Sequence, residues 1–191
     1  MNNDLHIGLP QWLGEYTGEY GRCFPEDEDR ISLVIELAAR NVEEDLGGPF
    51  GAAIFQSGTG RLISAGVNRV MDQNCSVLHA EVMAIMLAQR RLGTFTLARG
   101  SSEPPFELAC SCEPCAMCIG AITWSGIQRL VCAAREVDAF AVGFDEGFKP
   151  HDWIGQYRSR GIAVRRDVMR EEACAVFQRY VQLGGVIYNP S

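Results

Sequence analysis

His79-Ala80-Glu81 and Pro114-Cys115-Ala116-Met117-Cys118 are the two segments of this chain that carry the most chemical information. One imidazole and two thiols can supply three metal ligands, and this mixture of nitrogen and sulfur donors is typical of zinc. Three protein ligands leave the fourth tetrahedral position open, which is the arrangement of a catalytic zinc site. Glu81 follows the histidine closely enough to move protons beside the metal. The two segments therefore predict one catalytic Zn²⁺ per chain, held by His79, Cys115 and Cys118.

A closed structural zinc site is the alternative interpretation. Cys110 and Cys112 supply further thiols, so a four-cysteine site is compatible with the spacing. A closed site would give no reason for a carboxylate beside the histidine, however. The proline before Cys115 also indicates a helix start, where unpaired N–H groups stabilise thiolates. We therefore favour the catalytic arrangement.

Composition narrows the range of functions. The chain has 191 residues, of which 47% are hydrophobic and 21% charged, as expected for one globular domain with a real core. The formal net charge of −7 argues against a polyanionic substrate, so we expect no nucleic-acid partner. No stretch approaches the roughly 20 apolar residues that cross a bilayer. We expect no membrane partner and a cytoplasmic location, in a reducing compartment that leaves the clustered cysteines free for metal.

The order of elements along the chain indicates the fold class. Apolar residues at helical spacing alternate with short apolar runs that are bounded by glycine-containing turns. Because strands alternate with helices, we expect an α/β layered fold. Helices are predicted near 31–42, 79–92, 115–125, 153 and 170–183, and strands at 51–56, 61–66, 106–110, 130–133 and 162–165. Residues 1–25 show no period and are predicted to form an irregular arm on the surface.

Taken together, these motifs resemble the guanine deaminase branch of the cytidine deaminase-like superfamily. The resemblance covers most of residues 30–150 and rests on these segments: Gly47-Gly48-Pro49-Phe50-Gly51-Ala52, Ala65-Gly66-Val67-Asn68, His79-Ala80-Glu81, Ser111 to Cys118, Trp124-Ser125 and Gly143-Phe144-Asp145-Glu146. It implies a three-layer α/β/α fold with a mixed five-stranded sheet. It also implies a zinc-dependent deaminase domain over residues 26–183 that hydrolyses guanine to xanthine and ammonia.

The resemblance assigns roles to individual residues. Glu81 is expected to be the catalytic acid and base. Asn68 is expected to hydrogen-bond the purine, and Glu146 to accept hydrogen bonds from the N1 and exocyclic amino edge of guanine. Phe50 and Trp124 are expected to contact the flat ring. The backbone N–H of Ala80 is expected to reach the substrate near the reacting carbon.

The end of the chain, residues 184–191, is expected to be a tail. In the family it is exchanged between two subunits, which implies a homodimer in which Tyr188 closes the partner's site. The residues alone allow another interpretation. Val186, Ile187 and Tyr188 are apolar and are expected to pack on a protein surface, which can be their own subunit instead of a partner. A tail over the site would leave no room for a ribose, whereas an open site would admit guanosine or another amino-heterocycle. The alternative outside the enzymes is a binding module that zinc stabilises and that has no catalytic turnover.

Overall fold

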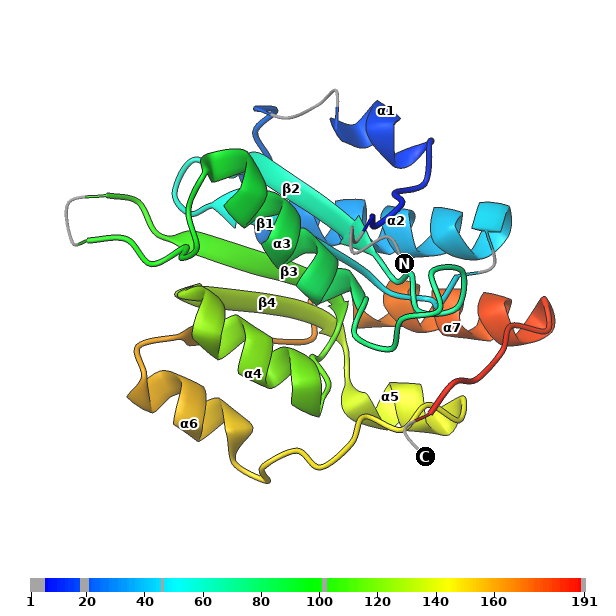
Figure 1. The fold of residues 1–191 in the computed structure, drawn as a ribbon. Coiled ribbons are helices and arrows are strands. Elements are labelled where there is room, and N and C mark those ends of the chain that lie inside the picture. The colour runs from blue at the N-terminus through cyan, green and yellow to red at the C-terminus, as the bar shows by residue number, and fades with distance from the viewer. Residues whose placement is uncertain (1–5, 18–20, 46, 101–102, 190–191) are drawn as a thin grey trace, which may run out of the picture.

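A mixed sheet lies at the centre of the computed structural model, which describes residues 6–17, 21–45, 47–100 and 103–189. Its strands are β1 (Gly51–Gln56), β2 (Arg61–Val67), β3 (Phe106–Cys112), β4 (Arg129–Ala134) and β5 (Ala163–Arg165), in the spatial order β2-β1-β3-β4-β5 (Figure 1). β1 runs antiparallel to both β2 and β3, whereas the β3–β4 and β4–β5 pairs are parallel. The predicted mixed five-stranded sheet is confirmed.

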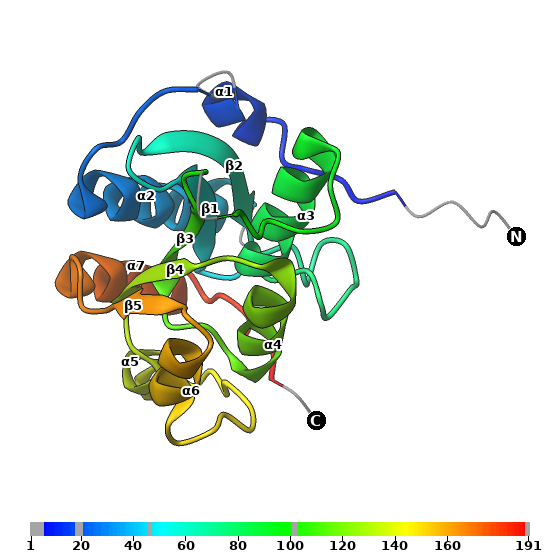
Figure 2. The same cartoon turned by 90° about the vertical axis from the view of Figure 1, so that its left-hand side faces the viewer.

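Helices cover both faces of the sheet. They are α1 (Leu13–Thr17), α2 (Asp27–Asp45), α3 (Ala80–Leu92), α4 (Ala116–Ser125), α5 (Glu136–Ala141), α6 (Trp153–Ser159) and α7 (Arg170–Gln182). Figure 2 shows α2 and α7 on one side of the sheet and α3 and α4 on the other. Alternate residues of β1 point to these two sides: Ala53 and Phe55 join the core under α2 and α7, and Ala52 and Ile54 join the core under α3 and α4. The three-layer α/β/α architecture therefore agrees with the expectation.

Two parts of the chain differ from the sequence-based prediction. The segment predicted to be an irregular surface arm contains α1 and buries Trp12 and Leu13. Aromatic contacts hold this segment on the domain. Trp12 packs edge-on against Tyr16, and the guanidinium of Arg40 on α2 lies over the Trp12 ring. Residues 1–5 and 18–20 of the arm lie outside the described residues. Helix α5 was not predicted, because six residues are too few to show a helical period.

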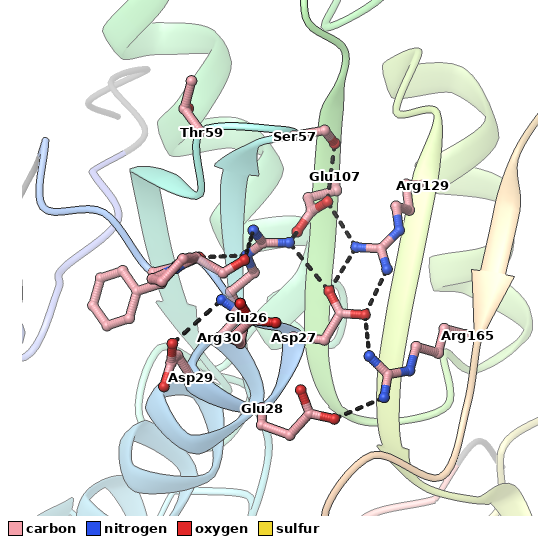
Figure 3. Close-up of polar contacts among 12 residues, drawn as sticks. Glu26, Asp27, Glu28, Asp29, Arg30, Ser57, Thr59, Glu107, Arg129 and Arg165 are labelled. Atoms are coloured by element: carbon pink, nitrogen blue, oxygen red, sulfur yellow. Dashed lines mark hydrogen bonds and ion pairs between the residues drawn. The ribbon is translucent and has the colours of Figure 1, made fainter.

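A network of charges joins the elements at the end of the sheet where β3 and β4 begin (Figure 3). Glu107 on β3 accepts hydrogen bonds from Arg30 at 2.6 Å and from Arg129 at 2.9 Å. Asp27, in the first turn of α2, accepts from Arg129 and from Arg165 of β5, both at 2.5 Å. The hydrogen bonds from Arg129, followed by those from Arg165, lower the pKa of Asp27 to about 2. The network thus ties the start of α2 to three neighbouring strands.

None of the helices in the described ranges combines the length and the apolar character that crossing a lipid bilayer requires.

Candidate metal centre and substrate pocket

Two helix starts bring the predicted metal ligands together. His79 is the residue before α3, and Cys115 is the residue before α4. The Nδ1 atom of His79 lies 3.5 Å from the Sγ atom of Cys115, and the ligand atoms of His79, Cys115 and Cys118 all lie within 4.8 Å of one another. Cys115 was predicted as the first helical residue, but its backbone is extended and its sulfur caps α4 by accepting from the N–H of Cys118 at 3.4 Å.

This group fits zinc. Tetrahedral bonds of about 2.0–2.3 Å place neighbouring nitrogen and sulfur donors roughly 3.5 Å apart, which is the separation between His79 and Cys115. The hydrogen bond from Cys118, with a further contribution from His79, lowers the pKa of the Cys115 thiol to about 4 and so favours the thiolate that zinc requires. Cys110 and Cys112 are not part of this group; they are buried in β3, where burial raises the pKa of both thiols. The three-ligand arrangement is therefore preferred over the four-cysteine alternative.

Glu81 lies in the first turn of α3 and faces the same cavity as His79 and Cys115. Its carboxyl group is buried, and burial raises its pKa above the usual value for glutamate. A carboxyl group that is easier to protonate can both accept and return a proton during a reaction. The position and the environment of Glu81 therefore fit the predicted role of proton carrier.

A cavity of about 390 Å³ opens beside the metal ligands. One wall is aromatic, because Phe50 and Phe144 pack edge-on with ring centroids 5.1 Å apart. Glu146 lines the cavity from the loop after α5, and its backbone oxygen accepts a hydrogen bond from the N–H of Ala116 at 2.9 Å. Burial, with the nearby Cys115 thiolate, raises the pKa of Glu146 to about 8. The cavity therefore combines a flat apolar wall with a few polar groups, as small-molecule sites do.

Asn68 is buried and is not one of the residues that line this cavity. Its Oδ1 atom accepts from the N–H of Val70 at 3.2 Å, and its backbone oxygen accepts from Asn41 at 3.0 Å. Among the described residues, its Nδ2 atom has no hydrogen-bond partner, and neither does the hydroxyl of Tyr188. Both side chains pack against Gly48, where an added Cβ would collide with the Tyr188 hydroxyl. Two unpaired buried polar atoms so close together indicate a place where a polar ligand binds.

Comparison with known proteins agrees with this geometry. Residues 25–134 match the family described as the cytidine and deoxycytidylate deaminase zinc-binding region. The chain belongs to this family. The guanine deaminase of Bacillus subtilis is 39% identical over 121 residues, covering 63% of this chain and 72% of the relative. A structure of the guanine deaminase from Nitrosomonas europaea is 46% identical with a TM-score of 0.89, covering 94% of this chain and 97% of that chain. A solved complex with 2,6-diaminopurine is 47% identical with a TM-score of 0.91, covering 99% and 98% of the two chains.

The tail of this deaminase lies over its own pocket. Asn189 accepts from the N–H of Asp145 at 2.8 Å and donates to the oxygen of Gly143 at 3.0 Å. The Tyr188 ring lies edge-on to Phe144 with centroids 5.5 Å apart. Within one chain the tail therefore makes the contacts expected for the alternative considered from the sequence, in which it packs on its own subunit. Its exchange with a partner stays a prediction. Residues 190 and 191 lie outside the described residues.

The predicted role of Trp124 is not supported in its own chain. Its side chain is 89% exposed and does not line the cavity. The cause is the helical register of α4, in which Cys118, Ile122 and Ser125 face inward and Trp124 falls on the outer face. Ala80 is the buried first residue of α3, and a helix leaves its first N–H groups without acceptors inside the helix. The contact between its N–H and the substrate stays a prediction.

Sequence reasoning missed several residues of the pocket. Phe144 was quoted only as part of a motif, yet it contacts Phe50, Tyr180 and Tyr188. Asn189 was also missed, although a polar residue directly after the predicted lid tyrosine was a usable signal. Glu113, buried beside the metal ligands, was seen only as part of the cysteine motif.

Proposed function

We propose that this deaminase hydrolyses guanine to xanthine and ammonia. One observation carries the proposal: the metal-ligand group and Glu81 open onto a single aromatic cavity whose polar wall is Glu146. The guanine deaminases among its relatives support the choice of substrate, because the neighbouring structure aligns over nearly the whole chain. The zinc-binding family supports the metal.

The residues would divide the chemistry between them. His79, Cys115 and Cys118 would hold the zinc, which would supply a Lewis acid that makes water nucleophilic near neutral pH. Glu81 takes the proton that water releases and passes it to a ring nitrogen, which makes the attacked carbon more electrophilic. Glu81 would then take the proton of the hydroxyl group that has been added to the carbon and deliver it to the amino group, so that the C–N bond breaks and ammonia leaves. One carboxylate thus acts first as a base and then as an acid.

Orientation of the ring is the second contribution of the protein. In the proposal, Glu146 accepts hydrogen bonds from the N1 and amino edge of guanine, Asn68 bonds the purine, and Phe50 contacts the ring face. The Nδ2 atom of Asn68 and the Tyr188 hydroxyl, both without partners among the described residues, are available for such bonds. Holding the reacting carbon in line with the nucleophile removes much of the entropic barrier.

Ammonia release from guanine, guanosine, cytosine and cytidine, measured in parallel with zinc content, tests the proposal. We expect the largest kcat/KM for guanine, because the tail contacts the pocket wall where a ribose would need space. A larger kcat/KM for guanosine would instead support the nucleoside deaminase alternative. Zinc without any turnover would support the binding module.

Four broader expectations belong to the same proposal. We expect the enzyme to act in purine catabolism, in the cytoplasm, and as a homodimer with no nucleic-acid partner. The net charge of −7 supports the last point, because polyanions bind basic surfaces. Sedimentation of the purified enzyme tests the dimer.

A further inference from the structure

Strand β3 carries a buried glutamate near each end. Glu107 belongs to the charge network at the start of the strand, whereas Glu113 follows its last residue and lines the cavity. Both carboxylate oxygens of Glu113 are already engaged: Oε2 accepts from the N–H of Glu136 at 3.0 Å, and Oε1 accepts from Arg166 at 2.9 Å. A carboxylate with both oxygens occupied by protein donors is poorly suited to bind substrate, so its effect must pass through its partners.

These partners connect the two segments that carry Cys115 and Glu146, both of which line the cavity. At one end, the N–H of Glu113 donates to Ala134 at 2.9 Å, and its side chain holds the first N–H of α5. At the other end, the N–H of Ala116 donates to the backbone oxygen of Glu146 at 2.9 Å. The metal-binding turn, residues 113–116, is therefore joined to residues 134–146 at both of its ends. Between these joints lies only α5 and the short turn that follows it.

A lysine with a buried side chain, Lys149, forms a further ion pair with the start of α5. Lys149, three residues after Glu146, places its Nζ atom 3.4 Å from a carboxylate oxygen of Glu136. The residue whose N–H is held by Glu113 therefore also anchors the far end of the loop that carries Glu146. Displacing the start of α5 would move both supports of that loop together.

We propose that Glu113 is a positioning residue that sets the distance between the metal ligand Cys115 and Glu146, the carboxylate that binds the substrate. The proposal rests on the proposed function, since it concerns how that site holds guanine. A purine must reach the metal with one edge and Glu146 with another, so the separation of the two groups decides whether both contacts form together. Misplacement by about 1 Å can cost roughly a hundredfold in rate.

The test compares Glu113→Ala and Glu113→Gln with the parent enzyme, all loaded with zinc. Glu113→Ala should lower kcat/KM for guanine about a hundredfold and weaken the binding of the guanine isostere 8-azaguanine, measured by calorimetry, while zinc stays at the parent level. Glu113→Gln should recover most of the loss, because its amide oxygen can still accept from the N–H of Glu136. Arg166→Gln should have a small effect, since it leaves that hydrogen bond in place.

Glu107→Gln is the matched control, a buried acid near the other end of the same strand. It should lower the melting temperature at least as much as the Glu113 variants and leave kcat/KM and 8-azaguanine binding within about twofold of the parent. A Glu113→Ala enzyme that stays within threefold of the parent, loses its zinc, or is no worse than Glu113→Gln would overturn the inference. Failure of the parent itself to release ammonia from guanine would refute the proposed function instead.

Discussion

Glu81 is buried in the first turn of α3 and lines the same cavity as Cys115, so its negative charge is poorly solvated. Burial raises its pKa, and the neighbouring Cys115 thiolate adds to the effect. At this scale the sequence was informative, because the ligands and the proton carrier depend on local spacing that the helix starts preserve. The sequence did not predict that Trp124 faces outward in its own chain, since nothing in a local motif specifies which way one residue faces at the far end of a ten-residue helix.

Glu81→Gln should keep the fold and the zinc but lower kcat for guanine by about 10² to 10⁴-fold, because the amide fills the same space and cannot take a proton. Ammonia release per zinc atom is the measurement. Glu103→Gln, a change of the same type at an exposed position, serves as the control. A Glu81→Gln enzyme within a few-fold of the parent would show that another group carries the proton.

Replacing both Cys115 and Cys118 by serine should abolish zinc binding, because the hydroxyl is a far weaker zinc ligand than a thiolate. Elemental analysis of the purified variant measures the loss. Cys23→Ser is the control, since Cys23 is exposed and remote from the ligand group. Full zinc content in the double variant would contradict the assignment of these ligands.

At the scale of elements, strands with both faces covered and helices that end at glycine were predictable. Helix α3 ends as expected, with Gly93 in the left-handed region at φ 64°. Helix α5 and the packing of α1 were not predictable, because they depend on contacts between distant parts of the chain. The charge network is of the same kind, because Asp27 and Glu107 are 80 positions apart in the sequence and are joined only in the folded chain, through Arg30 and Arg129.

Asp27→Asn should lower the unfolding free energy by roughly 2 kcal/mol at neutral pH, the scale of hydrogen bonds to charged groups. The folded-state pKa of Asp27, about 2, lies below the unfolded value of about 3.9. The ionised Asp27 carboxylate therefore contributes fully to the unfolding free energy above pH 4, and this contribution is lost as the pH falls from about 4 towards 2. Urea unfolding across this range should show the parent and the variant converging in acid.

Asp29→Asn controls for the helix start, since Asp29 lies in the same turn but is exposed and accepts a hydrogen bond from the N–H of Glu26. Its unfolding free energy should follow that of the parent at every pH. An Asp27→Asn difference that persists unchanged at pH 2 would contradict the role assigned to the ionised carboxylate.

For the whole molecule, the arrangement of the tail decides whether one chain makes a complete site. The contacts of Asn189 with the loop before Glu146 are made within one chain, so the tail can close the pocket of its own subunit. Local sequence could not settle this, because a glycine pair permits the chain to turn either way and both alternatives bury the same apolar residues.

Removal of residues 186–191 should leave the zinc and the fold intact, lower guanine turnover sharply, and raise the relative rate on guanosine. Asn189→Ala should give a smaller loss of the same kind, seen mainly as a higher KM. If each tail stays on its own subunit, as its contacts within one chain allow, mixing tail-deleted chains with Glu81→Gln chains should restore no activity. Recovery of activity after confirmed subunit exchange would show that the tail crosses to the partner.

Because Trp124 faces outward, its fluorescence can report on the surface around α4. The chain contains three tryptophans, and Trp12 and Trp153 are only 6% exposed while Trp124 is 89% exposed. Iodide should therefore quench one emitter readily, at the red edge of the spectrum, and leave the other two protected. If two subunits meet through the outer face of α4, that accessible fraction will shrink as the protein concentration rises. A fluorimeter would then report association without any label.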